Sequence, residues 1–288
     1  MNERNKTKMK KFLSLLLALT LALTCVIGLA SCDSNEIIIA IPNDTTNEAR
    51  ALRLLEAQGL ITLDDNTKET ITPANIVDNP YDITFREVEA AQIPSILSDV
   101  TYAVINSNYA IGAGLTPFVT EGTDIAYPNI LTVKEGTENT DKIKALKAAL
   151  NSAAVKEYIE ENYKGAVVCD LKNASADGFD STVDYAALNG TTIKVAASPT
   201  PHADILEAAK EILATKGITL DIIEFNDYVQ PNMVVEEGEC DANYFQHVPY
   251  LTDFNKEKGT HLISILEVHH EPMGVYSAEY DSFDAIKK

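Results

Sequence analysis

The sequence is short of positive charge and of cysteine, and both shortages narrow the class of protein. Its 23 Lys and Arg residues face 43 Asp and Glu residues, which gives a net charge of −20. A surface of this sign repels nucleic acid and anionic lipid, so we expect no nucleic-acid partner. The four cysteines form no Cys-x-x-Cys pair, and their spacing implies no disulfide.

A single long apolar run lies at the N-terminus. Residues 1–11 carry five cations, and residues 12–30 are almost wholly apolar, which is the profile of a signal peptide. The run ends in Leu-Ala-Ser before Cys32, which resembles a bacterial lipobox, where the cysteine is acylated and becomes the mature N-terminus. The alternative is an uncleaved membrane helix, because the run is nearly long enough to span a bilayer. The small residues before Cys32 and the polar tail after it favour the lipoprotein.

The charge of the predicted mature chain bears on where the protein is located in the cell. Removal of residues 1–31 takes away five cations and one acid, so the remainder is still more acidic. Membrane association must then come from the lipid on Cys32. We therefore expect a protein anchored by lipid on the extracytoplasmic face of a bacterial cell membrane. There a disulfide between Cys169 and Cys240 is permitted, but free thiols are expected.

Strands, polar turns and helices alternate along the 288 residues, which suffice for one large or two medium domains. The alternation predicts an α/β fold with mainly parallel sheets. Residues 169–190 have few large apolar side chains and are interpreted as a linker or surface loop. The predicted strands are 36–41, 83–88, 101–105, 130–133, 192–197, 220–225 and 261–268, and the predicted helices include 93–97, 141–150 and 153–163.

Two stretches carry candidate binding chemistry. The turn at 43–47 precedes a helix whose free N–H groups attract an anion, and Arg50 could reach back to a carboxylate with a bidentate fork. An ordinary helix cap with a surface arginine is the alternative. Aromatic and amide residues alternate between Phe225 and Tyr250, beginning at a strand end, where ligand pockets lie. Here the alternative is that the aromatics belong to the core.

Five segments together resemble the NlpA/MetQ family of methionine-binding lipoproteins of ABC importers. The resemblance implies a two-lobed, periplasmic-binding-protein-like (type II) α/β fold with a ligand cleft between the lobes. The segments are Ile-Pro-Asn-Asp at 41–44 with Asn47 and Arg50, Ala-Val-Ile-Asn at 103–106, Ala-Ser-Pro-Thr-Pro-His-Ala at 197–203, Phe-Asn-Asp-Tyr at 225–228, and 242–250.

The order of these segments departs from the family. Family members begin with the Ser-Pro-x-Pro-His half and end after a Gly-Ala-Val-Val tail, whereas that tail lies here at 165–168. We interpret the chain as a circular permutation, with residues 169–189 joining the family's usual ends; a splice of two gene fragments that does not fold is the alternative. The predicted lobes are 32–126 with 277–288, and 127–276. The family's Leu-Pro-Arg is Ile93-Pro94-Ser95 here.

The resemblance also implies the site residues. Arg50 and Asn47 would bind the carboxylate of an amino acid, and Asn106 and Asn129 would be amides that recognise its backbone. A thioether would lie among Tyr228, Phe245, His247 and Tyr250, since sulfur packs well at aromatic edges. The predicted function is therefore that of a lipid-anchored protein that binds methionine, with L-methionine favoured, and passes it to an ABC permease and its ATPase.

A metal site and an enzyme are two further hypotheses. A metal site of His261, His269 and His270 is disfavoured because adjacent strand residues face opposite ways. An enzyme built on Cys240 and His247 would lack an orienting partner. We expect no metal, no cofactor and no catalysis. The remaining alternatives are another apolar amino acid or a short peptide as ligand, or a surface lipoprotein without a transport role.

Overall fold

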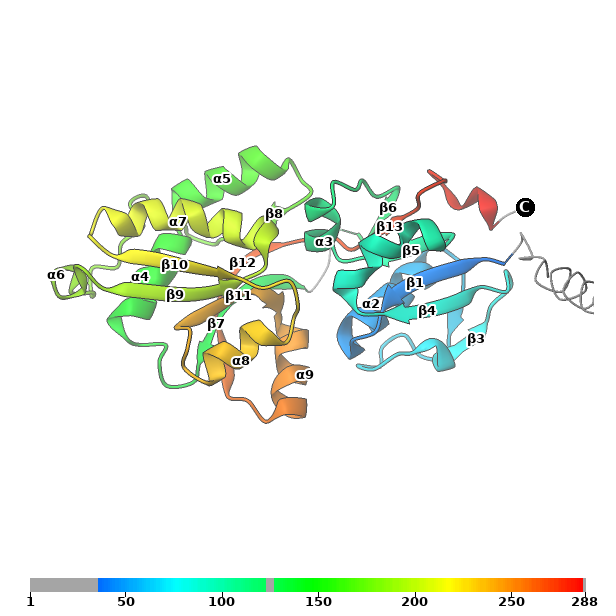
Figure 1. Ribbon diagram of the computed structural model, residues 1–288, viewed down its shortest axis with the longest axis horizontal. Coiled ribbons are helices and arrows are strands. Elements are labelled where there is room, and N and C mark those ends of the chain that lie inside the picture. The colour runs from blue at the N-terminus through cyan, green and yellow to red at the C-terminus, as the bar shows by residue number, and fades with distance from the viewer. Residues whose placement is uncertain (1–35, 123–126, 287–288) are drawn as a thin grey trace, which may run out of the picture. The chain divides into compact units, whose positions relative to one another are not determined.

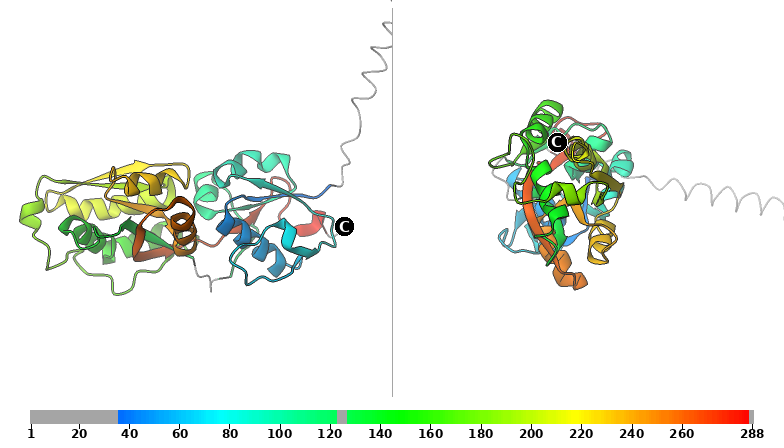
Figure 2. Two further views of the ribbon diagram at one scale, coloured as in Figure 1. Left: turned by 90° about the horizontal axis from the view of Figure 1, so that it is seen from below. Right: turned by 90° about the vertical axis from the view of Figure 1, so that its left-hand side faces the viewer.

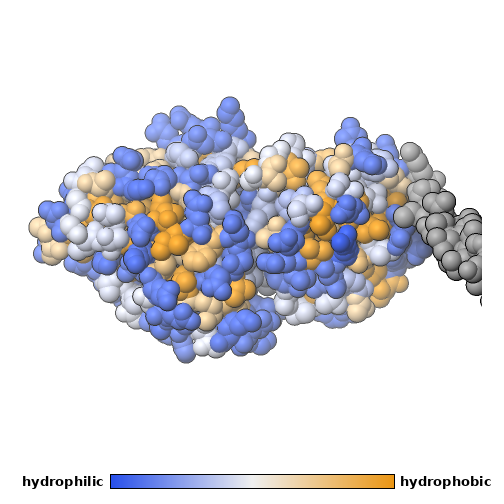
Figure 3. All heavy atoms as spheres, in the orientation of Figure 1, coloured by the Kyte–Doolittle hydropathy of each residue, from blue (hydrophilic) through white to orange (hydrophobic). Residues whose placement is uncertain are grey.

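The computed structural model describes residues 36–122 and 127–286, and its described residues from Ile37 onward form one compact unit. The predicted signal peptide and Cys32 lie outside the described residues. No helix in the described part of the chain is long and apolar enough to cross a membrane. Hydrophilic residues cover much of the face shown in Figure 3, as the excess of acids leads one to expect.

The first lobe is built around a five-stranded sheet. Its strand order is β4 (Thr84–Val88), β1 (Ile38–Pro42), β5 (Tyr102–Ile105), β13 (Gly274–Tyr276) and β6 (Val119–Thr120). Its helices are α2 (Thr45–Ala57), the 3₁₀ segment η2 (Ala90–Asp99), α3 (Ser107–Gly112) and two short 3₁₀ turns, η1 (Pro73–Asn75) and η4 (Phe283–Ala285), beside a two-stranded ribbon of β2 (Thr62–Leu63) and β3 (Ile76–Asp78).

The second lobe has a six-stranded sheet. Its order is β10 (Thr219–Glu224), β9 (Thr192–Ala197), β11 (Ala242–His247), β7 (Pro128–Lys134), β12 (Leu262–His270) and β8 (Val168–Cys169). Its helical segments are α4 (Asp141–Leu150), α5 (Ala153–Tyr163), α6 (Tyr185–Leu188), η3 (Pro199–Ala203), α7 (Asp204–Ala214), α8 (Gln230–Glu236) and α9 (Val248–Lys258). Figure 1 shows α5 and α7 on one face of this sheet and α8 and α9 on the other.

Each face of the second sheet has its own apolar cluster. Val195 and Ala197 pack with α4, α5 and α7, whereas Ala196 between them packs with α8 and α9. The alternation follows from the two-residue period of a strand, and a strand covered on both faces must be apolar throughout. The predicted α/β architecture with two lobes is confirmed.

The prediction of mainly parallel sheets is wrong. Strands β1, β4 and β5 are parallel to one another, as are β9, β10 and β11, but β7 and β13 pair antiparallel with both of their neighbours. The physical reason is that the chain crosses from one sheet to the other at two places. Strands β7 and β13 are the first strands after these crossings. Each enters its sheet at the edge where the neighbouring strands end, so it runs in the opposite direction to them.

The C-terminal segment completes the first lobe. Strand β13 pairs with β5 and β6, so the predicted lobe boundary after Tyr276 lies too far along the chain. Phe283 and Ile286 are buried in the same apolar cluster as Ile39 of β1. Figures 1 and 2 show this red segment beside the blue start of the described chain. Both ends of the described chain therefore belong to one core.

Residues 170–190 are more ordered than the linker interpretation implies. Leu171, Val183 and Leu188 are buried in the main core of the second lobe. Ser175 forms an isolated β-bridge with Ser152, and each backbone bonds the other segment. The few apolar residues of this segment therefore belong to the core, which the composition of the segment alone does not predict. The predicted helix at 93–97 is a longer 3₁₀ segment, Ala90–Asp99, with Pro94 inside it.

Candidate ligand-binding site

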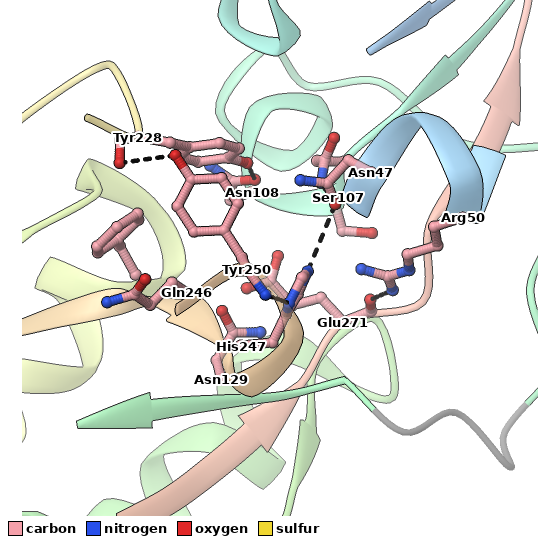
Figure 4. A pocket seen from close by; sticks show the side chains of 12 residues that line it. Asn47, Arg50, Ser107, Asn108, Asn129, Tyr228, Gln246, His247, Tyr250 and Glu271 are labelled. Atoms are coloured by element: carbon pink, nitrogen blue, oxygen red, sulfur yellow. Dashed lines mark hydrogen bonds between the residues drawn. The ribbon is translucent and has the colours of Figure 1, made fainter. Parts of the chain in front are cut away.

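One pocket is lined by residues of both lobes, and it gathers all eight residues that the sequence singled out. The cavity is small, about 30 Å³. That these residues bind a ligand stays a prediction. The lining consists of Asn47, Arg50, Asn106, Ser107, Asn108, Asn129, Tyr228, Phe245, Gln246, His247, Tyr250 and Glu271 (Figure 4).

The start of α2 places Asn47 and Arg50. Asp44 is the N-cap, and its carboxylate accepts hydrogen bonds from the Asn47 backbone N–H at 3.0 Å and from the Asn47 side chain. Burial raises the pKa of Asp44, and the bonds from Asn47 oppose that shift. The turn at 43–47 therefore supplies the cap of this helix. Arg50 follows one turn later, so its side chain leaves the helix on the pocket side.

Arg50 is not a surface arginine. It is 5% exposed, and its guanidinium forms a bidentate pair with Glu121, at 2.8 Å from Nε to Oε1 and 2.6 Å from Nη2 to Oε2. Nη2 also donates to the Glu271 carbonyl at 2.8 Å, and the guanidinium carbon lies 4.5 Å from the Tyr127 ring centre. Such contacts fix a planar fork in one orientation. Figure 4 draws the remaining nitrogen, Nη1, on the side of the pocket.

Two amides extend this polar wall. Asn106 follows β5 directly, and its Nδ2 donates to Asn47 Oδ1 at 2.9 Å. Asn106 Oδ1 is buried and has no hydrogen-bond partner among the described residues. Asn129 lies near the start of β7, and its Oδ1 faces His202 Nε2 at 2.9 Å. The pocket therefore contains at least one amide acceptor that the protein itself does not satisfy.

The opposite wall is aromatic. The rings of Tyr228, Phe245 and Tyr250 lie 5.8 to 6.1 Å apart, centre to centre, and two of the three pairs are edge-on. The Tyr250 hydroxyl donates to the Tyr228 carbonyl at 3.0 Å. Phe245 is only 3% exposed. These aromatics thus pack against one another and line the pocket at once, so the core interpretation and the pocket interpretation both hold.

Tyr228 also connects the two lobes. Its hydroxyl donates to Asn108 Oδ1 of α3 at 2.7 Å, and the neighbouring Tyr109 hydroxyl donates to the Asn226 carbonyl at 3.0 Å. The rings of Tyr109 and Tyr228 lie 5.1 Å apart. Burial raises the pKa of Tyr228 well above its usual range, so its hydroxyl stays a donor at neutral pH.

His247 is neutral and links the two walls. Its Nδ1 accepts from the Tyr250 backbone N–H at 3.3 Å, which leaves the proton on Nε2, and Nε2 lies 3.4 Å from Asn47 Oδ1. Burial first, and Arg50 second, lower its pKa to about 3. Because both ring nitrogens have partners, His247 is not paired with Cys240. Cys240 is buried, and burial raises the pKa of its thiol.

Four lining residues were not singled out from the sequence. Ser107 and Asn108 come directly after Asn106 at the end of β5, and side chains at strand ends commonly line ligand pockets. Glu271 follows β12 at the passage between the sheets, where the same rule applies. Gln246 lies between two residues that were chosen, and its amide joins a buried network, with Nε2 to Asn232 Oδ1 at 2.6 Å.

A buried cluster of His202, His269 and Glu271 lies behind the polar wall, and the side-chain donor atoms are within 4.8 Å of one another. The three histidines considered as a metal site, His261, His269 and His270, do not form a cluster. His270 faces Asp170 at 2.9 Å, whereas His269 faces Glu271 at 2.8 Å. The expectation that these neighbours point apart is confirmed. Cys169 and Cys240 are free thiols, as expected.

Comparison with known proteins identifies the family. The family model described as NlpA lipoprotein matches residues 31–170 and 193–288. The chain is 42% identical over 135 residues to membrane lipoprotein TpN32 of Treponema pallidum, covering 46% of this chain and 50% of that protein. It is 35% identical over 134 residues to the probable D-methionine-binding lipoprotein MetQ of Pasteurella multocida, covering 45% and 49%.

One solved structure similar to the chain is a nutrient binding protein from Burkholderia cenocepacia bound to methionine. The identity is 38%, the TM-score is 0.43, and the match covers 46% of this chain and 57% of that one. The chain thus spans about half the length of the curated relatives that it matches. Because the family model covers most of the sequence in two segments, the chain belongs to the NlpA lipoprotein family.

Proposed function

We propose that the protein binds methionine in this pocket and delivers it to the permease and ATPase of an ABC importer. The observation that carries the proposal is a polar wall around Arg50 that faces an aromatic wall across one pocket. The relatives named for methionine support the choice of ligand. Pockets with a few placed polar groups on an apolar lining are typical of small-molecule sites.

The polar wall suits the backbone of an amino acid. Arg50 is held by Glu121 and by the Glu271 carbonyl, so its fork is already oriented when the ligand arrives. A carboxylate would bind to the Arg50 nitrogen that faces the pocket. Preorganised donors lose little side-chain entropy on binding, which increases affinity.

The aromatic wall suits a thioether. Sulfur makes favourable contacts at ring edges, worth about 0.3–1.5 kcal/mol each. Tyr228, Phe245 and Tyr250 present both edges and faces because two of their three pairs are edge-on. L-methionine and D-methionine place the same thioether on opposite sides of the α-carbon, and a titration with each enantiomer would assign the preference.

The test is calorimetric titration of methionine into purified protein. The protein should first be unfolded and refolded to remove ligand carried through purification. Saturable heat and a rise in the melting temperature are expected. The absence of both would refute methionine as ligand. A competition series would then test the second candidate, in which the ligand is another apolar amino acid or a short peptide.

The remaining features of the proposal concern the cell. The lipid on Cys32 would hold the protein at the extracytoplasmic face of the membrane, near its permease, and the protein would bind its ligand without catalysis. Uptake of labelled methionine by a strain that expresses the protein with the adjacent permease genes would test the role in transport. A Cys32→Ala variant should be released from the membrane fraction. Normal uptake without the protein would favour a surface lipoprotein with no transport role.

We also infer that the chain is a circular permutation of its family. The family match breaks after residue 170 and resumes at 193, where the usual ends would be joined. Ile37 and Ile286 both pack against one core, so the present ends can be reconnected at little cost. A rearranged gene that places residues 190–288 before residues 36–168, joined by a short flexible linker, should give a protein of similar melting temperature. Failure of this rearranged chain to fold would count against the permutation.

A further inference from the structure

A second cavity lies beside the pocket, and it is much larger. Its volume is about 410 Å³, compared with about 30 Å³ for the pocket, and the larger value is within the ~300–1,000 Å³ typical of small-molecule sites. Its lining comes from both lobes and includes Thr46, Arg53, Lys68, Tyr127, Pro249 and Lys256. This space is called the outer cavity. The proposed carboxylate and thioether contacts leave it unused.

The pocket and the outer cavity lie along the same two helices. α2 of the first lobe contacts α9 of the second lobe (Figure 1). On α2, Arg50 lines the pocket and Arg53 lines the outer cavity. On α9, Tyr250 lines the pocket and Pro249 lines the outer cavity. A ligand that extends out of the pocket between these helices therefore enters the outer cavity.

Tyr127 separates the two spaces. It lines the outer cavity, and its ring centre lies 4.5 Å from the guanidinium carbon of Arg50 and 5.0 Å from the ring centre of His247. Both of these partners line the pocket. Tyr127 itself is partly exposed, and a partly exposed ring can change its rotamer without disturbing a buried core. The barrier between the proposed carboxylate position and the outer cavity is therefore one movable side chain.

Cations outnumber acids in the lining of the outer cavity, although acids outnumber cations in the chain as a whole. The charged lining residues are Arg53, Lys68, Lys256, Glu69 and Asp253. Lys68 pairs with Asp64 at 2.6 Å. Neither Arg53 nor Lys256 forms an ion pair with an acid in the described part of the chain. Each lobe therefore offers the outer cavity one cation that is available to an anionic group.

Arg53 is held in place by the backbone. Its Nε donates to the Asn66 carbonyl at 2.8 Å, and its Nη2 donates to the Lys68 carbonyl. The carbonyl oxygens fix the plane of the guanidinium but do not neutralise its charge, so a carboxylate would gain a full counter-charge there. Because the donor is already oriented, little side-chain entropy is lost when a ligand binds.

The spacing of the two arginines matches one residue of a peptide. Arg50 and Arg53 are three positions apart on α2, which corresponds to a rise of ~4.5 Å along the helix, and residues three apart are neighbours on its surface. An extended peptide advances by ~3.3–3.6 Å per residue. A ligand with its methionine carboxyl group at Arg50 and one further residue therefore brings its C-terminal carboxylate close to Arg53.

We propose that the outer cavity is the subsite for a second residue, and that the protein binds dipeptides of the form Met-Xaa as well as methionine. The methionine occupies the pocket, its peptide carbonyl lies at Arg50, and the C-terminal carboxylate lies between Arg53 and Lys256. The inference rests on the proposed function. It extends the ligand class from the free amino acid to dipeptides that begin with methionine.

Dipeptides that end with methionine are excluded. Their extra residue is attached to the amino group of methionine, so it would have to fit within the pocket itself. The pocket has a volume of about 30 Å³, and its amides Asn106, Asn108 and Asn129 are at most 8% exposed. The direction of the peptide therefore distinguishes a subsite in the outer cavity from a general tolerance of peptides.

The test is calorimetric titration of refolded wild-type protein with methionine, Met-Ala, Met-Ala amide and Ala-Met. The amide keeps the second residue but lacks the terminal carboxylate. Ala-Met has the same composition as Met-Ala in the opposite order. Mass spectrometry of the bound fraction establishes that each peptide is intact.

Two variants with matched controls locate the carboxylate. Arg53→Gln is compared with Arg86→Gln, at an exposed arginine of β4. Lys256→Gln is compared with Lys258→Gln, at an exposed lysine that ends α9. Each control removes the same charge at a position that lines neither the pocket nor the outer cavity. Melting curves establish that each variant is folded.

We expect wild type to bind Met-Ala within ~10-fold of methionine, and to bind Ala-Met at least ~30-fold more weakly than Met-Ala. Loss of the terminal carboxylate in the amide, or of either cation in the protein, should weaken dipeptide binding by ~3- to 10-fold, because it removes a partly exposed, hydrogen-bonded ion pair. Arg53→Gln and Lys256→Gln should bind methionine as their controls do.

The other outcomes separate this inference from the proposed function. Wild type that binds methionine, but binds Met-Ala more than ~100-fold more weakly or no better than Ala-Met, would overturn the second-residue subsite alone. Equal affinity for Met-Ala and its amide would also overturn it, even if a variant fails to fold. Binding of Met-Ala without binding of methionine would support the subsite and overturn methionine as the ligand. Protein that binds neither would overturn the subsite and the proposed function together.

Discussion

The two walls of the pocket are assembled in different ways. The aromatic wall comes from one stretch of the second lobe, since Tyr228 follows β10, Phe245 lies in β11 and Tyr250 lies in α9. The polar wall depends on contacts across the whole chain: Arg50 meets Glu121, 71 positions away, and the Glu271 carbonyl, 221 positions away. A local segment can therefore create an apolar wall, whereas a charged wall needs the complete fold to hold each charge in place.

The most damaging change to this arrangement is the loss of Arg50. Arg50→Ala alone would leave the mostly buried Glu121 without its cation, with the Met273 backbone N–H still donating to it, at a cost of about 3–5 kcal/mol in folding free energy. The double variant Arg50→Ala/Glu121→Gln removes both charges. We expect it to melt within a few degrees of wild type and to bind methionine at least ~30-fold more weakly. Calorimetry and melting curves measure the two effects, and retained affinity in the double variant would show that the polar wall does not hold the carboxylate.

Acid should destabilise the protein through the buried histidines. Burial lowers the pKa of His202, His247 and His269 to about 3, below the usual value near 6.5. Between these two pKa values the unfolded chain binds more protons than the folded one, so stability is full above about pH 6.5 and falls as the pH falls. The slope is about 1.4 kcal/mol per pH unit for each histidine.

Urea unfolding between pH 7 and pH 4.5 measures this slope. Burial raises the pKa of Glu48 to about 8 and also raises the pKa of Asp44 and of Glu271. All three carboxyl groups act in the opposite direction, so the net slope should be much smaller than the sum over three histidines. A midpoint that rises on acidification would contradict neutral, buried imidazoles behind the polar wall.

A smaller effect is expected where the walls meet across the lobes. Tyr228→Phe removes the hydroxyl that donates to Asn108, a bond worth about 0.5–1.5 kcal/mol. Methionine affinity should fall by ~2- to 10-fold because the contact joins the lobes around the ligand. Tyr163→Phe is the control, since its hydroxyl bonds Asp204 within the second lobe. Equal losses of methionine affinity in both variants would show that the contact between the lobes made by the Tyr228 hydroxyl does not contribute to binding.

The weakest effect should be seen in the aromatic wall alone. Phe245→Leu keeps apolar volume but removes a ring edge. We expect methionine to lose up to ~1 kcal/mol of binding free energy, while norleucine, which has a methylene in place of sulfur, should change little. Binding of the two ligands to wild type and variant isolates the sulfur contact. An equal loss of binding free energy for both ligands would mean that the Phe245 ring contributes only apolar contact area and no specific contact with sulfur.

The same contrast between local and long-range contacts explains what the sequence could predict. Helices α4 and α5 and strand β9 have the predicted bounds because each has its own apolar pattern, cap or turn. All eight candidate residues line one pocket because strand ends and the family resemblance pointed to them. Strand β13 was missed because it has three residues and is defined by its pairing with β5 and β6.

The sequence does not predict the cluster of Glu271 and His202 for a related reason. His202 stands out only as part of the segment 197–203, Glu271 has no local motif, and the cluster exists because η3 and the end of β12 meet beside Asn129. The partner of Arg50 was hidden in the same way, since Glu121 has no local motif. Charged contacts between distant segments leave no periodicity in a sequence, so only the fold reveals them.

The most direct measurement is a crystal structure of the protein with methionine bound. The account predicts the ligand carboxylate at Arg50 and its sulfur, located by anomalous scattering, among Tyr228, Phe245 and Tyr250. A ligand bound in the reverse direction, with sulfur at the polar wall, or bound outside this pocket, would contradict the account.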